Sequence, residues 1–414
     1  MTVTTGSTSS SPGTGMDAGL TYLIGESIYL RGLEIGDAKW GSAWRFSPFP
    51  LAAQSLEERL KKTVPKSSDR RLTTVVACRR NDDRIVGSAH LDDFGNTESV
   101  VLLHADPALQ NAGAEIQAEM LGLLVPWLID ERHRPLVRVT TDAGMAPVLA
   151  AGEGLGMRLS ARLRDGSWRN GAFHDRLFLE AFNPRWLDRV GDPGAGIDDE
   201  REAPTPVRSP APRRDSHAAL PLPNNAVIGS ERLALRPQEV DDAERIARWI
   251  RAEPQNSFGH SRFPYSAIML GDWFGEIGTD DIPENLELGV VLRETGELIG
   301  ENGLYAIDWM ARTAETGSWI YRPEYRNAGY GTEAKHLLLE YAFDRIGLHS
   351  VWSWVKTLNP RSQAALRKQG YRDAGRFNWV GFGPDGFESA QMFDLLASEW
   401  RAARDRGASP AREG

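Results

Sequence analysis

Runs of apolar residues alternate with polar turns along most of the chain, and they predict strands and helices in a repeating order. Between the strands of the first half, residues 116–129 carry apolar side chains at the spacing of an α-helix. Strand-like runs in this half occupy residues 27–31, 72–78, 84–91, 99–104, 136–140 and 173–182. Strands mixed with helices predict an α/β fold built on a mixed (α+β) sheet.

Short motifs of the first half recur in the same order in the second half. The matching segments are Ile24-Gly25 with Ile228-Gly229, Leu30-Arg31 with Leu235-Arg236, Ile85-Val86-Gly87 with Leu298-Ile299-Gly300, and Pro107–Gly113 with Pro323–Gly329. Any single match could arise by chance, but the shared order and the similar spacing indicate a tandem duplication. We therefore expect two domains of the same fold.

Composition divides the chain at a proline-rich segment. Residues 191–223 contain repeated Pro together with Asp, Arg and Ser, which cannot form a core and therefore predict a linker. Residues 1–19 are Ser, Thr and Gly with almost nothing to bury, which indicates disorder. The predicted organisation is a disordered tail at 1–19, a first domain at 20–190, the linker at 191–223, a second domain at 224–402 and a tail at 403–414.

Charge and composition narrow the functional class. A net charge of -9 and a pI of about 5.5 argue against a general nucleic-acid binder. The single cysteine, Cys78, lies in an apolar run and the eight histidines are scattered, so we expect no metal site. We identify no signal peptide and no apolar stretch long enough to span a membrane, which favours a cytoplasmic enzyme or binding protein.

One stretch of the second half, residues 319–334, has the layout of a phosphate-binding turn. An apolar strand leads into a basic, glycine-containing turn, and a helix follows directly. Glycines let the backbone approach a ligand closely, and the free N–H groups at the helix start face it. Gly329-x-Gly331-x-x-Ala334 also fits the dinucleotide fingerprint. However, the next strand ends in Lys356 rather than in the acidic residue that would hold a ribose, so NAD binding is disfavoured.

The motif Arg326-x-x-Gly329-x-Gly331 resembles the acetyl-CoA signature of the GCN5-related N-acetyltransferases (GNAT), which is Gln/Arg-x-x-Gly-x-Gly/Ala. Its surroundings resemble the branch that includes the ribosomal-protein alanine acetyltransferases. The segments that carry this likeness are Glu231–Pro237, Gly317–Arg326, Gly329–Ala334, Asn359-x-x-Ser362 and Lys368–Tyr371. The resemblance covers about residues 228–396. It implies a twisted mixed sheet flanked by helices, with strands splayed at a V-shaped opening that holds acetyl-CoA.

The same resemblance implies which residues bind acetyl-CoA. Backbone amides of the turn from Arg326 to Thr332 would cradle the pyrophosphate, helped by the positive end of the following helix. The strand end at residues 319–321 would pair with the pantetheine arm, and Asn359 and Ser362 would contact pantetheine and the sulfur. The implied set is Trp319, Ile320, Tyr321, Arg326, Asn327, Ala328, Gly329, Tyr330, Gly331, Thr332, Asn359 and Ser362.

Two carboxylates are candidates for the base that takes a proton from the attacking amine. Glu315 is the first choice, because it lies just upstream of the signature strand, where related enzymes carry a catalytic acid; Glu301 is the second. The leaving thiolate also needs assistance. Many family members use a tyrosine for this step, but Leu366 stands at that place, so Ser362 becomes the candidate.

The corresponding positions of the first domain are altered. Gln110 and Gly113 are kept, but Glu115 stands where the second glycine belongs. Met145 and Val148 replace the Asn and Ser of the second domain. A carboxylate in the phosphate turn would repel a pyrophosphate. We therefore expect a degenerate GNAT-like domain that binds acetyl-CoA weakly or not at all.

Together these features predict an N-acetyltransferase that transfers acetyl from acetyl-CoA to a primary amine by direct attack in a ternary complex. The acceptor could be a small molecule or a protein N-terminus, and the acidic overall charge favours a cationic one. Two alternatives stay open: a transferase that uses a longer acyl-CoA such as succinyl-CoA, and a non-catalytic acyl-CoA-sensing protein. We expect no metal, no nucleic acid, no membrane partner, and a monomer or homodimer.

Overall fold

The structure is a computed structural model of the chain. It describes residues 23–47, 49–63, 72–92, 97–194, 196–197, 222–252, 265–276, 282–383 and 385–408. The predicted N-terminal tail and most of the predicted linker lie outside these residues. The last helix, α10 (Ala397–Ala408), runs into the segment that we predicted as a C-terminal tail.

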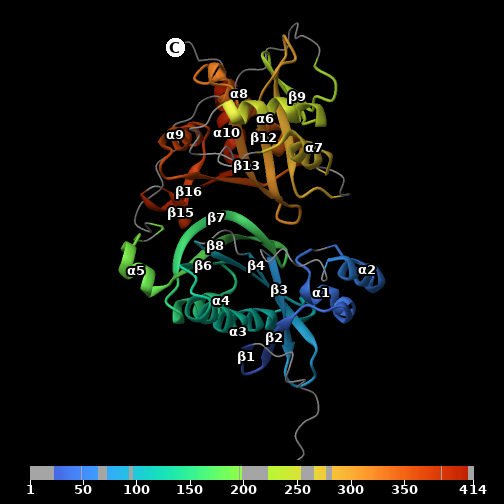
Figure 1. Cartoon of the computed structure of the whole chain (residues 1–414), viewed down its shortest axis with the longest axis vertical. Helices are drawn as coiled ribbons and strands as arrows, with labels where there is room; N and C mark the ends of the chain where they lie inside the picture. Colours follow the sequence, from blue (N-terminus) through green and yellow to red (C-terminus); the bar gives the residue numbers. More distant parts are fainter. Residues whose placement is uncertain are drawn as a thin grey trace, which may run out of the picture. The chain divides into compact units, whose positions relative to one another are not determined.

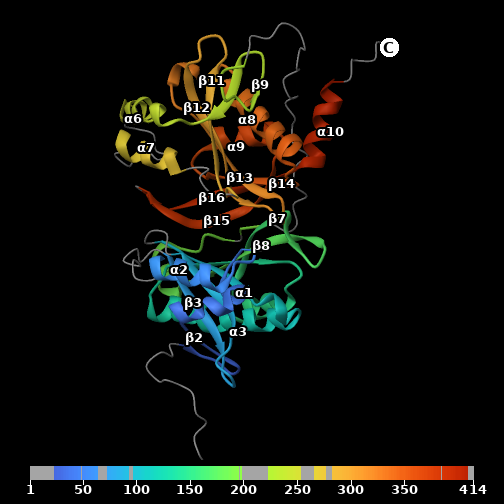
Figure 2. The same cartoon turned by 90° about the vertical axis from the view of Figure 1, so that its right-hand side faces the viewer.

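The chain forms two compact units, whose elements are labelled in Figures 1 and 2. The N-terminal unit holds the residues up to Thr141, with Met145–Met157 and Glu180–Arg189. The C-terminal unit holds Asp142–Gly144, Arg158–Leu179 and the chain from Val190 onward. The boundary at residues 191–223 between the two copies of the repeat stays a prediction. The compact units do not test it, because each unit is assembled from segments that alternate along the chain.

The N-terminal unit is a sheet in the order β1-β2-β3-β4-β5-β6, antiparallel except for the parallel pair β5–β6. Its strands are β1 (Leu23–Ile24), β2 (Ile28–Gly32), β3 (Leu72–Arg79), β4 (Ile85–Asp92), β5 (Ser99–Ala105) and β6 (Leu136–Asp142). Its helices are η1 (Ile35–Trp40), α1 (Gly41–Trp44), α2 (Ala53–Thr63), η3 (Pro107–Leu109), α3 (Ala112–Pro126), η4 (Trp127–Glu131), α4 (Ala146–Gly154) and α5 (Pro184–Val190). Cys78 is fully buried on β3, as expected for an inert thiol.

The apolar helix of this unit corrects one expectation. The helical stretch Ala112–Glu131 is long and apolar enough, by length and composition, to cross a membrane. Its side chains Met120, Leu121 and Leu124 are fully buried in a core with residues of the sheet such as Val139. The stretch therefore owes its apolar character to packing against the sheet, as the core helix of a folded unit does.

The C-terminal unit is a mixed sheet in the order β8-β7-β15-β16-β14-β13-β12-β11-β10-β9. Strand β8 belongs to this unit as far as Leu179. Its strands are β7 (Arg158–Arg169), β8 (Ala172–Phe182), β9 (Ile228–Gly229), β10 (Leu233–Pro237), β11 (Leu286–Leu292), β12 (Leu298–Asp308), β13 (Thr313–Ile320), β14 (Ser350–Lys356), β15 (Arg372–Gly383) and β16 (Gly386–Leu396). Its helices before α10 are η5 (Val240–Asp242), α6 (Ala243–Ala252), α7 (Ala267–Glu276), η7 (Pro323–Tyr325), α8 (Tyr330–Glu340), η8 (Tyr341–Ile346) and α9 (Pro360–Lys368). The predicted mixed α/β fold is confirmed.

Helices cover the C-terminal sheet with two separate cores. α8 packs in one core with Leu304 and Ala314 of β12 and β13. α6 and α7 pack in another core with Val291 and Leu298 of β11 and β12. On β10 (Leu233–Pro237), the consecutive residues Leu235 and Ala234 belong to the first and to the second core respectively. Because successive side chains of a strand point to opposite faces, the two cores lie on opposite faces of the sheet.

Elements follow one another in the same order in both halves of the chain, from the short opening hairpin to the last helix. A buried ion pair also recurs: Arg31 binds Asp37 at 2.8 Å, and Arg236 binds Asp242 at 2.7 Å. Each aspartate also accepts a backbone N–H three residues upstream and completes a capping box. These parallels support the predicted tandem duplication.

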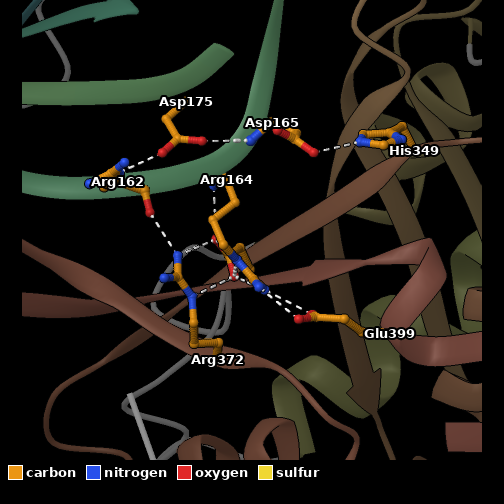
Figure 3. Close-up of polar contacts among 8 residues, drawn as sticks. Arg162, Arg164, Asp165, Asp175, His349, Arg372 and Glu399 are labelled. Carbon is orange, nitrogen blue, oxygen red and sulfur yellow. Dashed lines mark hydrogen bonds and ion pairs between the residues drawn. The ribbon is translucent and has the colours of Figure 1, made fainter. Parts of the chain in front are cut away.

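Strand β7 is fixed to the C-terminal unit by a network of ion pairs (Figure 3). Arg164 donates to Asp394 at 2.9 Å and to Glu399 at 2.7 Å, and its backbone N–H also binds Asp394. Arg372 binds the same aspartate at 2.7 Å, and Asp165 binds His349 at 3.0 Å. Asp394 is almost fully buried, so its charge depends on these two arginines.

Two central strands of the C-terminal sheet part as the resemblance implied. β13 and β14 pair in parallel only from Thr313 with Ser350 to Glu315 with Trp352. Beyond that point β13 keeps its antiparallel pairing with β12 as far as Ile320. The backbone of β13 after Glu315 therefore leaves the β14 ladder on one side, which opens the sheet into a V.

Candidate active site

The turn that follows β13 is held by one arginine. Arg326 donates through Nε to the Ile320 carbonyl at 3.0 Å and through Nη2 to the Tyr321 carbonyl at 2.9 Å. These carbonyls belong to the end of β13, so the guanidinium ties the turn back to the strand. The sequence predicted a basic side chain in this turn. The structure shows in addition that the Arg326 side chain fixes the shape of the turn through these hydrogen bonds.

Two left-handed residues lead into helix α8. Asn327 has φ 66° and Gly329, the N-cap residue, has φ 84°. The first backbone bond of the helix runs from the Glu333 N–H to the Gly329 carbonyl at 3.0 Å. The N–H groups before it have no acceptor one turn back, as at the start of any α-helix, and they can bind an anion.

Gly331 has room for a side chain on the protein side. A Cβ at this position would meet only the Ile320 Cγ1 at 3.6 Å, an ordinary van der Waals distance, and its backbone needs no positive φ. The fold therefore gives no reason for glycine here. A ligand that approaches the backbone of the first helical turn would give one, so the residues present fit the pyrophosphate of CoA.

Glu333 anchors the start of α8. Its carboxylate accepts from the Ser230 Oγ at 2.5 Å and from the Arg232 Nε at 2.8 Å. The Arg232 guanidinium also lies over the Tyr330 ring, 4.4 Å from its centroid, and donates to the Ala328 carbonyl at 3.4 Å. These contacts join the phosphate turn to β10 and keep the helix start in place.

The other arm of the V carries Asn359 and Ser362. Asn359 is the N-cap of α9, and its Oδ1 accepts the Ser362 N–H at 3.1 Å. The spacing of the two residues is thus also a helix-capping pattern. The half-buried Ser362 Oγ makes no hydrogen bond to a described residue, while Leu366 is buried in the core. The structure places both residues directly after β14, opposite the turn that follows β13.

Glu315 and Glu301 lie on one face of the sheet, but they do not form a pair. Glu315 is opposite Tyr305 on β12, whereas Glu301 is opposite Trp319. Four residues along a strand separate these two levels by roughly 13 Å. The structure therefore gives the two candidate bases different surroundings.

Burial raises the pKa of Glu315 to about 7, although a hydrogen bond from Trp354 and the charge of Lys335 oppose the rise. Such a carboxylate takes up and releases a proton near neutral pH. Glu301 is occupied differently. Its Oε2 accepts the Tyr321 hydroxyl and the Gln238 Nε2, the latter at 3.1 Å. Glu315 is therefore the better placed base of the two.

Tyr305 is a site residue that sequence reasoning missed. Its ring crosses Gly303 and Gly317, which face each other on β12 and β13. A Cβ on Gly303 would lie 2.3 Å from the Tyr305 hydroxyl, and a Cβ on Gly317 would lie 2.8 Å from its ring. Burial raises the pKa of Tyr305, and the negative charges of Glu301, Glu287 and Glu315 raise it further, which places its hydroxyl near the three carboxylates.

Lys335 and Tyr371 were missed as well. Lys335 is 3% exposed, and burial lowers its pKa to about 7, although the charge of Glu315 opposes the change. Its Nζ lies 5.8 Å from the centroid of the Tyr371 ring. The Tyr371 hydroxyl is 2.8 Å from the Thr316 Oγ1, just where β13 and β14 part. A lysine on a predicted helix gives no sequence signal of burial.

In the N-terminal unit, helix α1 covers the equivalent face of the sheet. The Ser88 Oγ donates to the Trp44 carbonyl at 3.1 Å, and the His104 Nε2 lies 2.8 Å from the Ser42 carbonyl. Glu115 is exposed in the first turn of α3. A negative charge at the start of this helix and a covered face both support the predicted loss of acetyl-CoA binding.

A family model described as an acetyltransferase (GNAT) domain matches residues 232–372. This range contains the phosphate turn, the splayed strands and both candidate bases. The chain belongs to the GNAT superfamily. The family predicted from Arg326-x-x-Gly329-x-Gly331 is confirmed, and the GNAT domain identifies the chain as a member of an acyltransferase family.

Known proteins similar to the chain include two from Bacillus subtilis (strain 168). The uncharacterized N-acetyltransferase YnaD is 35% identical over 113 residues, which are 27% of this chain and 64% of YnaD. YdaF, provisionally named a ribosomal N-acetyltransferase, is 26% identical over 42% of this chain and 97% of YdaF. The structure of spermidine N-acetyltransferase from Vibrio cholerae in complex with CoA and spermine is 22% identical. It covers 41% of this chain and 98% of that one, with a TM-score of 0.37.

Proposed function

We propose that the GNAT domain transfers an acetyl group from acetyl-CoA to a primary amine by direct attack in a ternary complex. The observation that carries this proposal is Gly331. The fold leaves room for a side chain there, but a large one is excluded if a pyrophosphate lies against the first turn of α8. The splay of β13 from β14 supports the same proposal, because it frees backbone groups for a pantetheine arm.

The proposed roles of the binding residues follow from their positions. N–H groups of Tyr330, Gly331 and Thr332 would hold the pyrophosphate at the positive end of α8. The free edge of β13 around residues 319–321 would pair with pantetheine, and an N–H there would stabilise the oxyanion of the tetrahedral intermediate. The thioester of acetyl-CoA supplies an electrophilic carbonyl carbon next to this edge.

Glu315 is proposed as the general base. An amine acceptor arrives mostly as an ammonium ion, and it must lose a proton before or during attack. A half-buried carboxylate with a pKa of about 7 can take that proton at neutral pH. The half-buried Ser362 Oγ is proposed to donate a hydrogen bond to the departing thiolate. The predicted acetyl-CoA cosubstrate, cytoplasmic location and monomeric or dimeric state remain part of this proposal.

Exchange of Gly331 tests the cosubstrate site. Gly331→Leu should raise the KM for acetyl-CoA at least tenfold, because the protein leaves room for its Cβ while the longer side chain enters the space proposed for the pyrophosphate. Gly122→Leu on α3 is the matched control, since this position is exposed and a Cβ there meets nothing within 4 Å. Steady-state release of CoA thiol measures both variants. An unchanged KM for Gly331→Leu would contradict the phosphate turn.

Two other functions remain candidates on the same site. An acyl-CoA-sensing protein would bind CoA without any amine-dependent thiol release, so a panel of amines separates it from an enzyme. A transferase for a longer acyl group such as succinyl would prefer succinyl-CoA in direct competition with acetyl-CoA. Each result would replace acetyl transfer as the function while leaving the CoA site intact.

A further inference from the structure

We propose that Gln238, Glu287 and Glu301 form a subsite that binds a second, non-reacting ammonium group of the acceptor. The acceptors would then be amines with two cationic groups, one beside Glu315 and one in this subsite. The inference rests on the proposed amine acetylation and specifies the class of acceptor.

Hydrogen-bond acceptors outnumber donors in this cluster. The Tyr321 hydroxyl donates to Glu301, and the Gln238 Nε2 lies 3.1 Å from the Glu301 Oε2 and 3.2 Å from the Tyr321 hydroxyl. These contacts use the side-chain donors of Gln238 and Tyr321, and neither of them reaches the Gln238 Oε1 or the Glu287 Oε2. The opposite amide orientation would place the Gln238 oxygen against the carboxylate, so the observed orientation is the favourable one.

Two buried oxygens are left without a partner. Gln238 is 8% exposed, and its Oε1 has no hydrogen bond to a described residue; Glu287 is 5% exposed, and its Oε2 has none either. A buried polar atom without a partner is unfavourable, because it has lost its hydrogen bonds to water. The Gln238 N–H donates to the Glu287 carbonyl at 3.4 Å, so the two residues are neighbours. A primary ammonium carries three N–H donors, and it can satisfy both oxygens as well as Glu301.

The surroundings favour an organic cation over a metal ion. Beside Glu301, the Tyr321 ring stacks on Trp249 at 5.6 Å and makes a T-shaped contact with Trp319 at 5.1 Å, and this apolar surface suits the alkyl chain of an organic amine. Among the described residues, no group of three or more His, Cys, Asp or Glu side chains could hold a metal ion.

Proton uptake by Glu287 supports the same assignment. Burial and the charge of Glu301 raise the pKa of Glu287 to about 8. Glu287 is therefore largely protonated at neutral pH without a ligand, and an ammonium beside it would favour release of that proton. The other titratable groups that face the cluster are Tyr265, Tyr305, Glu315 and Tyr321.

The register of the sheet sets the spacing between the two cationic groups. Glu287 is opposite Gly303, two residues along β12 from Tyr305, which is opposite Glu315. Glu301 lies two residues further from this level. The distance from Glu315 is thus roughly 7 Å to the level of Glu287 and roughly 13 Å to the level of Glu301. An alkyl chain of several carbons between the two amines would cover this distance.

A series of linear alkyl amines tests the subsite on the full-length protein. The ratio of kcat/KM for an α,ω-diamine to that for the monoamine of the same length should exceed ten. Glu287→Gln should bring this ratio close to one, while the exposed Glu284→Gln should leave it unchanged. Thermal unfolding of each variant shows whether it is folded. In the presence of CoA, which has no acetyl group to transfer, the wild type should bind the diamine at least tenfold more tightly in calorimetry than the monoamine of the same length.

The outcomes separate the two proposals. Equal kcat/KM for monoamines and diamines, or a diamine preference that survives Glu287→Gln, would overturn the subsite while leaving amine acetylation in place. Absence of thiol release with every amine would overturn the proposed function itself. If Glu287→Gln does not fold, the binding comparison on the wild type decides, because equal affinities for the diamine and the monoamine contradict the subsite.

Discussion

At Glu315, position and acidity point to the same role. The residue lies at the last paired level of β13, where the strand parts from β14. Burial holds its pKa at about 7, and the buried Lys335 nearby favours the charged carboxylate. Glu301, on the same face, is held by Tyr321 and Gln238, which fits recognition better than proton transfer.

The role proposed for Glu315 predicts how catalysis depends on pH. A base must be deprotonated to act, so kcat should be low below about pH 7 and rise as Glu315 loses its proton. Glu315→Gln should lower kcat by roughly 100-fold or more, the typical contribution of a general base, and should remove this acid limb. Stopped-time thiol assays from pH 5 to 9 measure both effects, with Glu284→Gln as the control. An acid limb that persists in Glu315→Gln would assign the base to another group.

At the scale of elements, the sequence predicted the backbone better than the side-chain clusters. The strand, turn and helix around Gly329 follow from local patterns, and the structure contains them. Tyr305 could not be predicted in the same way, because its place depends on Gly303 and Gly317 facing each other across two strands. That register is a property of the folded sheet. Gln238 likewise joins the cluster only through its contacts in the folded unit.

The β7 ion pairs make a prediction at this scale. Arg164→Ala should destabilise the protein by roughly 2–3 kcal/mol, because it removes charged hydrogen bonds from Asp394, which is 1% exposed. Arg162→Ala on the same strand is the control. The Arg162 side chain is paired with Asp175 but is 55% exposed, and exposed ion pairs contribute about 0–1 kcal/mol to the free energy of unfolding. Urea unfolding gives both values. Equal losses would show that burial of Asp394 adds nothing.

At the scale of the whole molecule, compact units and repeated sequence divide the chain differently. The repeat predicts a boundary in the proline-rich segment, whereas Arg158–Leu179 pack with the C-terminal unit. These residues share a buried cluster in which Ala161 and Leu163 meet Ala374 and Met392. Sequence patterns predict the order of the elements along the chain, but they do not predict which sheet a strand joins. The packing of Arg158–Leu179 with the C-terminal unit could therefore not be predicted.

Truncation tests whether the C-terminal unit needs β7 for its stability. A chain from residue 224 onward should unfold at a lower temperature than a chain from residue 158 onward, or fail to fold, because it lacks β7 and uncovers Met392 and Asp394. Calorimetry of both truncated chains makes the comparison. Equal transition temperatures would mean that β7 is dispensable and that the boundary at residues 191–223 delimits an independent domain.

The pairing of β7 with the C-terminal sheet also concerns synthesis on the ribosome. Arg164 and its partner Asp394 are 230 residues apart in the chain. At ordinary elongation rates, roughly 10–50 s pass between their emergence. During this interval the nascent hairpin of β7 and β8 has no C-terminal sheet to join, and an unpaired strand edge invites pairing with other chains. Chaperone capacity during translation should therefore affect the yield of this protein.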